Sequence, residues 1–553
     1  MKTFQPKLFT SLKNYSKGQL VNDLVAGIIV AIIALPLSIA LAIASGVSPE
    51  QGLYTAIIAG FVISFFGGSK VNISGPTAAF ATIVAGVVMQ HGISGLIMAT
   101  LMAGVFLILM GIFNFGSLIK YIPMTITTGF TSGIAITIVV GQVKDFLGLT
   151  FAEGTHAIET TEKIEAIVDS IGTLNLDALI VGVIGMAILI LWPMLGKVSK
   201  LLGKIPASII AVIAGILLVK FGPFEVNTIG TLYPDLKAGF PVPSLPEFSF
   251  DTMKAVLPNA FTIAILAAIE SLLSCVVSDG MINDRHNSNT ELIAQGLGNV
   301  ASGLFGGIPA TGAIARTAAN VKNGGRSPIS GMVHAVVLLL FLLVLMPLAK
   351  MIPMPIIAAI LFMVAYNMSE WRHFVKICRF SPKSDIFVLV LTFVLTIAFD
   401  LVVAIGVGIV LAAVLFIKRM SEVTYVRVWK ENTSGHDGKT KEIPAGTLVY
   451  EINGPMFFAN TNKFFDFELS DETKAIIVRM SNVSAIDATA MKNMENLYAA
   501  CQAKGVTLIL SHVNEQPMAV FAKAGFYEKV GIDNILPHID QALERAAEIC
   551  KEA

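Results

Sequence analysis

One carboxylate, Glu270, stands inside an otherwise apolar run of the sequence. The run covers residues 261–279 and reads FTIAILAAIESLLSCVVSD, in which Ser274 follows Glu270 by one helical turn and shares its face. A carboxylate inside a membrane span is costly and marks a candidate functional group. Glu270 can exchange a proton, bind a cation, or form a static ion pair with Arg316, and the sequence leaves these three interpretations open.

A second charged side chain, Arg316, lies in a glycine- and proline-rich stretch between two apolar segments. The stretch covers residues 305–331 and reads FGGIPATGAIARTAANVKNGGRSPISG. It is either a polar loop outside the membrane or irregular backbone within it, which persists only where protein or a cavity satisfies its N–H and C=O groups. The guanidinium fork of Arg316 suits a carboxylate or another oxyanion, and the alternative is contact with lipid phosphates from a loop.

Residues 66–81, FGGSKVNISGPTAAFA, repeat this pattern near the N-terminus. Both stretches begin with Phe-Gly-Gly and run through strand-like residues into a helix start made of small residues. In the first copy Gly75 can cap the helix and Pro76 suits its first turn, whereas the second start falls near Arg316. Short apolar segments interrupted by Gly and Pro at matching places in two halves indicate a transporter's binding site.

The two copies predict half-helices whose N-termini face each other near the bilayer midplane. Each N-terminus presents free N–H groups and about half a positive charge, which together make an anion-binding arrangement. Thr77 adds a hydroxyl on one side, and Arg316 adds a full charge on the other.

Composition places the whole chain in the membrane class. Apolar residues make up 55% and charged residues 14% of the sequence, and many runs exceed the roughly 20 apolar residues needed to span a bilayer. The net charge is zero and no basic block occurs, so we expect no nucleic-acid partner. The four cysteines lie far apart without a CxxC or Cys/His cluster, which argues against disulfides and zinc. We expect no catalytic residues, no resident cofactor or metal, and no enzymatic activity.

We predict fourteen membrane segments in a seven-plus-seven inverted repeat, with the halves at about 22–221 and 255–418. A match between KYIPM at 120–124 and KMIPM at 350–354 supports the repeat. The segments of the first half are 22–45, 50–66, 75–91, 93–115, 122–148, 176–196 and 204–221. Those of the second half are 255–279, 288–304, 315–323, 328–348, 354–369, 385–400 and 401–418.

The charges between segments predict their orientation, because short loops rich in Lys and Arg stay in the cytoplasm. Residues 1–21 and 370–384 are basic and are predicted inside, whereas 149–175 is acidic and is predicted outside. Lys418 and Arg419 end the last segment inside. An odd number of segments per half gives the halves opposite orientations, and these charges agree with it.

After the transmembrane domain, at 22–420, the character of the sequence changes. A polar linker is predicted at 421–445, followed by strand-like runs that alternate with helix-like segments, a pattern typical of a small α/β domain over 446–553. The strand-like runs are 446–452, 475–480 and 506–511, and the helix-like segments are 489–503, 515–524 and 536–549. Asp487 is predicted to cap the first of these helices, and Thr489 is a candidate phosphorylation site.

These features together resemble the SulP family of anion transporters, over nearly the whole chain. The motifs that carry the resemblance are ALPLSIALAIASGVSPEQGLY at 34–54, SGPTAAF at 74–80, the segment of Glu270, and the glycine-rich stretch from residue 306. The C-terminal domain resembles the STAS domain that follows the membrane part in this family. The resemblance implies fourteen segments, a core domain (segments 1–4 and 8–11) that moves against a gate domain, and a homodimer.

The resemblance also implies roles for individual residues. The anion is expected near Leu37, Leu41, Thr77, Ala78, Ala315 and Arg316. Glu270 matches an acidic residue that couples transport to protons or sodium, and a glutamate favours protons. Coupling by sodium would place the ion at Glu270, Ser274 and Gly312. In the STAS domain Thr489 holds the place of a phosphorylated residue and, with Asp487, is the expected regulatory position.

The expected function is that of a secondary active anion transporter in the bacterial inner membrane, with the N-terminus and the STAS domain in the cytoplasm. The expected substrate is sulfate, a dicarboxylate or bicarbonate, carried with protons by an elevator-type movement. The alternatives are a sodium-coupled bicarbonate transporter, an uncoupled exchanger or channel, and a nucleobase transporter on the same fold. A cytoplasmic regulatory protein or a nucleotide is the expected partner of the STAS domain.

Overall fold

A computed structural model of the chain provides the fold. It describes residues 4–13, 15–117, 123–152, 157, 159–198, 205–236, 239–240, 242–243, 249–399, 401–429, 433–434, 440–459 and 472–552. The chain forms two compact units, Met1–Val410 and Leu411–Ala553.

The first unit consists almost entirely of helices, and the described residues include eight that are long and apolar enough to cross a membrane. Its helices are α1 (Lys7–Leu12), α2 (Lys17–Ala44), α3 (Pro49–Phe66), α4 (Ala81–Ile112), α5 (Met124–Leu147), α6 (Thr160–Asp169), α7 (Leu176–Val198), α8 (Ala207–Phe221), α9 (Ile229–Leu232), α10 (Phe250–Ile282), α11 (Ser288–Leu304), α12 (Ile314–Lys322), α13 (Ile329–Ala349), α14 (Met354–Ser369), α15 (Trp371–Phe380) and α16 (Lys383–Ala398), and α17 (Leu401–Val423) runs from this unit into the second. Each predicted membrane segment falls on one of these helices, while the number of membrane crossings stays a prediction.

Two predicted segments, 75–91 and 93–115, lie end to end in α4. The helix breaks at Gly92, whose φ of 67° and ψ of −172° are not helical. A residue with a side chain adopts a positive φ only at a cost, whereas glycine adopts it readily. The break at Gly92 therefore separates two helical segments where the sequence predicts the end of one span and the start of the next.

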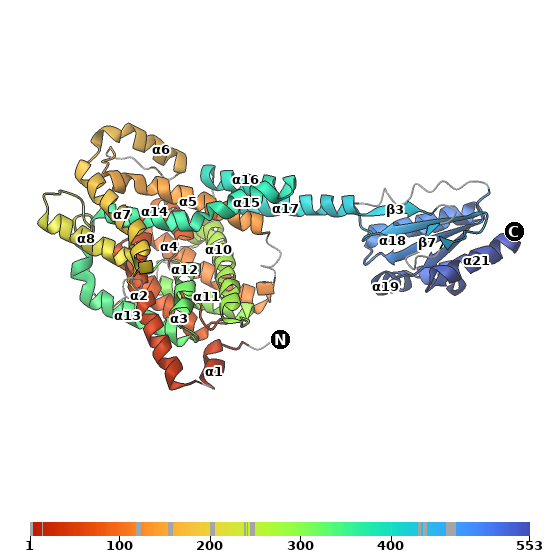
Figure 1. The fold of residues 1–553 in the computed structure, drawn as a ribbon, viewed down its shortest axis with the longest axis horizontal. Coiled ribbons are helices and arrows are strands. Elements are labelled where there is room, and N and C mark those ends of the chain that lie inside the picture. Colours follow the sequence, from red (N-terminus) through yellow and green to blue (C-terminus); the bar gives the residue numbers. More distant parts are fainter. Residues whose placement is uncertain are drawn as a thin grey trace. The chain divides into compact units, whose positions relative to one another are not determined.

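The centre of the first unit is a crossing of two short extended segments. Strand β1 (Ser74–Gly75) pairs antiparallel with β2 (Thr311–Gly312), in the register Ser74 with Gly312 and Gly75 with Thr311. A short 3-10 helix, η1 (Ala78–Phe80), leads from β1 into α4, and α12 follows β2. The nine residues of α12 rise about 14 Å, less than half of the bilayer's apolar core. Figure 1 shows α12 among the longer helices of this unit.

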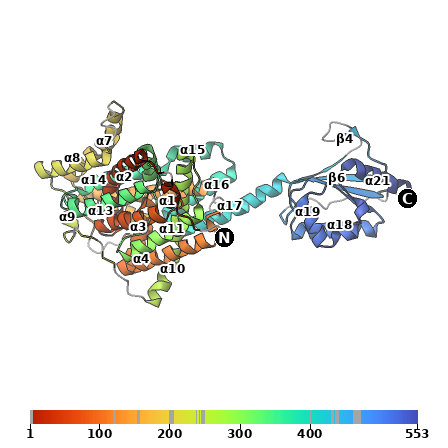
Figure 2. The ribbon, with the colours of Figure 1, turned by 90° about the horizontal axis from the view of Figure 1, so that it is seen from below.

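The helices around the crossing pack with exchanged partners from the two halves of the chain. Helix α4, from the half before residue 222, packs against α10 and α11 of the second half. Helix α13, from the second half, packs against α2 and α3 of the first. Figure 2 shows α13, α3, α11 and α4 lying one beyond the next. This exchange is the packing that an inverted repeat produces, and we call α2, α3, η1, α4 and α10–α13 the core group.

The remaining long helices of the first unit form a second group, made of α5, α7, α8, α14 and α16, which we call the gate group. Helix α5 packs against α14 and α16, and α14 packs against α7. Helices α5 and α14 begin directly after Pro123 and Pro353, the prolines of the two matching sequences. Residues 120–122 of the first match lie outside the described residues.

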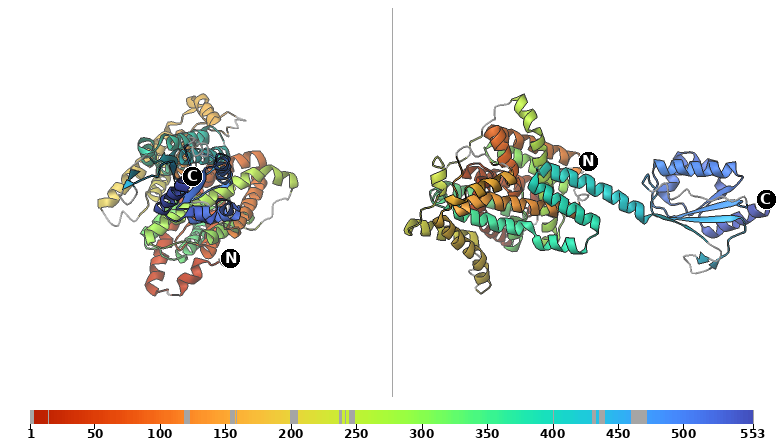
Figure 3. Two further views of the ribbon diagram at one scale, coloured as in Figure 1. Left: turned by 90° about the vertical axis from the view of Figure 1, so that its right-hand side faces the viewer. Right: turned by 90° about the horizontal axis from the view of Figure 1, so that it is seen from above.

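The second unit is a five-stranded sheet with helices on both faces. Its elements are β3 (Tyr425–Val428), β6 (Thr447–Asn453), β7 (Ala475–Asn482), α18 (Ala488–Ala503), β8 (Thr507–Ser511), α19 (Glu515–Lys523), α20 (Phe526–Val530), β9 (Ile535–Leu536) and α21 (Ile539–Glu552), and a separate two-residue pair, β4 (Thr433–Ser434) and β5 (Thr440–Lys441). The strand order is β3-β6-β7-β8-β9, and only β3 runs antiparallel to its neighbour. The sheet and the helices beside it are visible in Figure 3.

The linker predicted at 421–445 differs from the structure at its beginning. Residues as far as Val423 continue α17, and β3 joins the sheet beside β6. Val426 of β3 packs against the buried cluster under α18, so the sequence Tyr-Val-Arg-Val forms an edge strand where the sequence analysis predicted linker.

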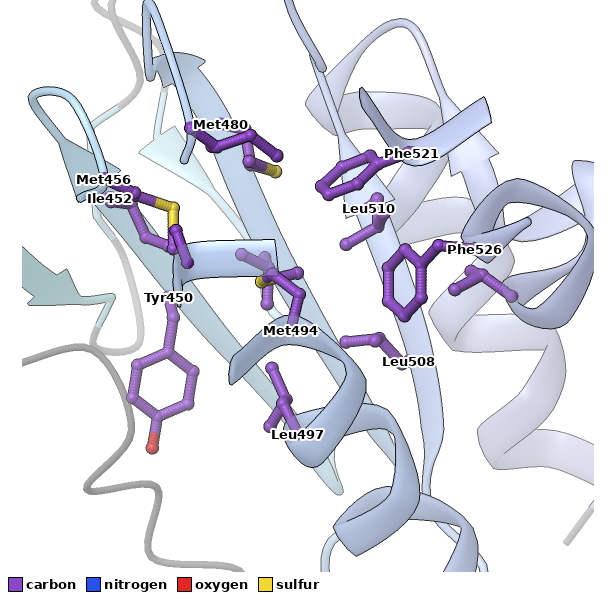
Figure 4. Close-up of a cluster of buried hydrophobic side chains, with 14 of the residues drawn as sticks. Tyr450, Ile452, Met456, Met480, Met494, Leu497, Leu508, Leu510, Phe521 and Phe526 are labelled. Carbon is purple, nitrogen blue, oxygen red and sulfur yellow. The ribbon is translucent and has the colours of Figure 1, made fainter. Parts of the chain in front are cut away.

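Alternation along the strands divides the buried side chains of this unit between two faces. Ile476, Val478 and Met480 of β7 point into a cluster with α18, α19 and α20, whereas Ala475 and Ile477 pack against α21. This is the period of two that a strand imposes. Figure 4 shows the first cluster, in which Phe521, Phe526, Leu508 and Leu510 lie close to Met494 and Leu497 of α18.

Removal of one aromatic ring tests this cluster. Phe521 is fully buried, so Phe521→Ala should lower the free energy of unfolding of a fragment covering residues 421–553 by about 3–5 kcal/mol. Urea unfolding followed by circular dichroism measures it. Ile532, which is 67% exposed, provides the control, because Ile532→Ala should change stability by no more than about 0.5 kcal/mol. Equal losses for both variants would show that the cluster is not the core of this unit.

Candidate functional site

The crossing brings two helix starts together, one from each half of the chain. Thr77 precedes η1 and Ala313 precedes α12, and neither residue caps its helix with a side-chain hydrogen bond. The backbone holds the two segments in place through the β1–β2 pair and through the Ala313 N–H, which donates to the Ile73 carbonyl at 2.8 Å. The N–H groups of both first turns therefore remain without side-chain caps, as an anion site between them requires.

Glu270 reaches this crossing from α10. The hydroxyl of Thr77 donates to Oε2 of Glu270 at 3.0 Å, and both side chains are half-buried. The hydrogen bond joins the residue expected to bind the coupling ion to the residue that begins the first half-helix.

Arg316 lies on the protected side of the crossing. It is 1% exposed, and its Nη2 donates to the Pro76 carbonyl at 2.9 Å. Its Nε and Nη1 have no hydrogen-bond partner among the described residues. The guanidinium is therefore held at the Pro76 carbonyl, just before the first helix start, and its contact with an anion stays a prediction.

A static ion pair between Glu270 and Arg316 was one of the three interpretations of the sequence. The ion pairs among the described residues do not include this one. Glu270 is instead bonded to Thr77, and Arg316 to Pro76. The carboxylate is thus free of a fixed cation in this structure, which leaves the proton and cation interpretations.

A row of small residues on α3 makes room for the buried guanidinium. A Cβ on Gly75 would lie 2.6 Å from Nη1 of Arg316 and 3.6 Å from Cβ of Ala56, so the guanidinium and α3 both lie close to this point of β1. One turn further, Gly60 faces the Ser74 carbonyl and the ring of His334. Larger residues at these positions would push the crossing away from α3.

The start of the second half-helix is accessible. Ala315 is exposed and Ile314 is 43% exposed, whereas Ala78 at the other start is buried. Leu37 and Leu41 lie one turn apart on α2, which packs against α12; Leu37 is half-buried and Leu41 is buried. Of the predicted anion-site residues, Ala315 is therefore the most exposed, and Arg316 and Ala78 are covered.

The residues predicted to hold sodium are engaged with other partners. Ser274 is fully buried, and its hydroxyl donates to Oδ1 of Asn72 at 2.7 Å. The N–H of Gly312 donates to the Ser271 hydroxyl at 3.0 Å. No hydrogen bond among the described residues joins Glu270, Ser274 and Gly312 to one another, and the described part of the chain has no cluster of three or more His, Cys, Asp or Glu side chains suited to a metal.

Polar residues on α11 were missed by the sequence analysis. Glu291, Gln295 and Asn299 are all buried and hydrogen-bonded to the two extended segments. They recur every four residues and so share one face of the helix. That spacing within a predicted membrane segment was the signal that could have identified them.

A cavity of about 200 Å³ lies between the core and gate groups, close to the first helix start. Its lining includes Ala79, Thr82 and Gln90 from the core group and Thr137 and Thr396 from the gate group. The hydroxyls of Thr82 and Thr137 lie 3.4 Å apart across the two groups. The cavity begins within one turn of Ala78, and its lining combines these polar side chains with apolar ones such as Ile83 and Ile134.

The two predicted regulatory residues lie at the start of α18. Oδ1 of Asp487 accepts from the Ala490 N–H at 2.8 Å and Oδ2 accepts from the Phe458 N–H at 2.9 Å, so Asp487 caps the helix as predicted. Thr489 is exposed in the first turn. Its modification stays a prediction.

Comparison with known proteins assigns the chain to a family. Residues 20–392 match the sulfate permease family, and residues 439–542 match the STAS domain. The chain belongs to the sulfate permease family. Its relatives include YvdB of Bacillus subtilis, which carries the provisional name of a sulfate transporter and is 40% identical, over 96% of this chain and 98% of YvdB. The bicarbonate transporter BicA of Picosynechococcus sp. is 31% identical, over 95% of this chain and 94% of BicA.

Solved structures show the same fold for this chain. A structure of SLC26A9 matches with a TM-score of 0.87 at 19% identity and covers 98% of this chain and 92% of its own. The transmembrane domain of a cyanobacterial BicA matches with a TM-score of 0.63 at 29% identity, over 72% of this chain and 98% of its own. The chain is therefore a multi-pass helical membrane protein with a transporter fold and a C-terminal STAS domain.

The tight packing at β2 gives a testable expectation. A Cβ on Gly312 would lie 2.7 Å from Nδ2 of Asn72 and 3.0 Å from Cα of Ser271, so Gly312→Ala should cost about 1–3 kcal/mol and lower the melting temperature in detergent. Gly86 of α4 has open space around it, and Gly86→Ala should leave the melting temperature unchanged or raise it. A Gly312→Ala protein as stable as the wild type would contradict the packing described here.

Proposed function

We propose that this chain is a secondary active anion transporter of the bacterial inner membrane, which binds its anion between the two helix starts. The observation that carries the proposal is the β1–β2 pair, which sets two uncapped helix starts side by side. Ala78 and Ala315 flank the proposed site, and Thr77 supplies a hydroxyl. Arg316 supplies positive charge, and its Nε and Nη1 have no hydrogen-bond partner among the described residues. The activity is movement of a solute, with no bond made or broken.

The candidate substrates are sulfate, bicarbonate and a dicarboxylate. The relatives named as sulfate and bicarbonate transporters favour the first two. Backbone N–H groups and one hydroxyl suit an oxyanion, because each can donate to an oxygen. Leu37 and Leu41 place apolar surface on the α2 side, which gives the anion no further donor there.

Coupling to protons follows from the Thr77–Glu270 hydrogen bond. While Glu270 is a carboxylate, it accepts the one hydrogen bond that the Thr77 hydroxyl can donate. Once Glu270 is protonated it becomes a donor, which frees the Thr77 hydroxyl to donate to an anion and removes a negative charge from the site. Proton and anion would then bind more tightly together than apart, which is a coupling free energy of the kind that symport needs.

The two helix groups suggest how the site could change sides. Both helix starts belong to the core group, so a movement of the core group against the gate group would carry the whole site with it. We propose such an elevator-type alternating access, in a homodimer, with the N-terminus and the STAS domain in the cytoplasm. The STAS domain is the proposed binding site of a cytoplasmic regulatory protein or nucleotide.

Uptake by proteoliposomes tests the function directly. Labelled sulfate, succinate and bicarbonate are offered in turn, each with and without an inward proton or sodium gradient. We expect one anion to accumulate under the proton gradient. Accumulation under sodium alone would move the coupling to sodium, and passive flux insensitive to both ions would indicate a channel or an uncoupled exchanger. Uracil uptake without anion uptake would indicate a nucleobase transporter.

Glu270→Gln tests the coupling mechanism. Glutamine keeps the size of the side chain and an acceptor for Thr77 but cannot exchange a proton, so uptake should become equal with and without the proton gradient. Initial rates measured from pH 5 to pH 8 should also lose their pH dependence. Asp251, an exposed residue on the first turn of the same helix, provides the control, because Asp251→Asn should keep the response to protons. Proton-driven uptake that persists in Glu270→Gln would exclude Glu270 as the coupling residue.

A further inference from the structure

We propose that Glu291 of α11 is a positioning residue, whose carboxylate holds the extended segment 67–75 and thereby the first helix start. The inference rests on the proposed function only where it concerns anion affinity. Glu291 is 1% exposed and lies outside the residues expected to touch the anion or the coupling ion. Its role is to fix the backbone that presents Thr77 and Ala78.

Four donors surround the carboxylate of Glu291. Oε2 accepts from the N–H groups of Gly68 at 2.8 Å and Ser69 at 3.1 Å. Oε1 accepts from Nδ2 of Asn72 at 2.8 Å and from Nε2 of Gln295 at 3.0 Å. Each of these groups only donates, so the pattern fits a carboxylate and fills both of its oxygens.

Gly68, near the start of the segment, has no side chain and so lets the backbone approach this carboxylate. A Cβ on Gly68 would lie 2.2 Å from the Asn287 carbonyl and 2.8 Å from the Glu291 nitrogen. The Asn287 N–H also donates to the Gly68 carbonyl at 2.9 Å. Gly68 is thus packed directly on the first turn of α11, where helix N–H groups and the Glu291 side chain meet the segment.

Asn72 links the segment to two further helices by hydrogen bonds. While its Nδ2 donates to Glu291, its Oδ1 accepts from the hydroxyls of Ser274 on α10, at 2.7 Å, and Thr317 on α12, at 3.0 Å. The Thr317 hydroxyl also accepts from the Ile73 N–H at 3.0 Å. Through Asn72, Glu291 is connected to the second half-helix, α12, and to α10, which carries Glu270.

The second extended segment is held in a different way. Its Ile308 N–H donates to the hydroxyl of Thr55 on α3 at 2.7 Å, and Asn299 bonds both the N–H and the carbonyl of Ala310. These partners are uncharged. The carboxylate therefore bonds to the first segment directly, and residues 306–310 of the second segment, which lie before the β1–β2 pair, are an internal control for a change at Glu291.

Glutamine at position 291 cannot replace the carboxylate. One oxygen of the carboxylate faces two backbone donors, and the other faces two amide donors. Whichever way a glutamine amide turns, its NH₂ group meets two donors and leaves them without an acceptor, and buried donors without partners are costly. The segment should therefore loosen locally in Glu291→Gln, although size and shape are kept.

Hydrogen–deuterium exchange of the full-length protein in detergent tests the hold without relying on transport. In Glu291→Gln, amide exchange in residues 67–75 should become faster by on the order of tenfold, while exchange in residues 306–310, which precede the β1–β2 pair, stays as in the wild type. Asp251→Asn is the control, because Asp251 is an exposed carboxylate on the first turn of α10 and lies outside both segments. Unchanged exchange in 67–75, or an equal increase in both segments, would overturn the proposal.

Uptake by the same variants measures the effect on the site. We expect Glu291→Gln to raise the KM for the transported anion by on the order of tenfold with Vmax per folded protein retained, and Glu291→Asp to recover part of the affinity. A loss of Vmax with KM unchanged would overturn the positioning role. If Glu291→Gln does not fold, Asn72→Ala takes its place, because it removes one of the four donors, and unchanged exchange and KM there overturn the proposal. Absence of uptake in the wild type together with faster exchange in 67–75 would refute the function and leave the positioning role standing.

Discussion

Backbone hydrogen bonding at the crossing is the constraint on which the rest of the transmembrane unit depends. Two extended segments interrupt its helices, and lipid offers no partner for their N–H and C=O groups. The β1–β2 pair joins only two residues of each segment. Side chains of the neighbouring helices supply the remaining partners, among them Thr55, Asn299 and Glu291. Helices α3 and α11 therefore carry polar residues on the faces that an ordinary membrane helix would fill with leucine.

The same crossing concentrates charge where charge is expensive. Arg316 lies on one side of β1, and Glu291 lies on another, each without an oppositely charged contact among the described residues. Nε2 of Gln295 donates both to Glu291 and to the hydroxyl of Ser74, next to Gly75, against which Arg316 packs. Both charges are therefore held by neutral hydrogen-bond partners and not by an ion pair with each other.

Much of this arrangement was predictable, because it follows from local rules. Gly and Pro mark the two helix starts, and Glu270 is conspicuous in an apolar run. The direction of Arg316 was not predictable, since a helix position does not say whether a neighbour such as Ala56 leaves space for a guanidinium. The role of Glu291 was missed for a related reason. Its carboxylate bonds to backbone that is distant in the sequence, and within its own segment only the four-residue spacing of polar residues indicates it. The strand β3 was missed because it is only four residues long and follows directly on α17, although Tyr-Val-Arg-Val has the alternation of a strand.

The first described residues are tied to the same part of the structure. The N–H of Lys7 donates to the carbonyl of Gly67 at 2.9 Å, at the entrance of the segment that Glu291 holds. The ammonium group of Lys7 donates to the Arg285 carbonyl, just before α11. For anyone who labels or purifies this protein, a bulky tag or a trimmed N-terminus is therefore not a neutral choice, because it acts on the backbone that leads to the site. A tag after the C-terminal unit leaves those contacts untouched.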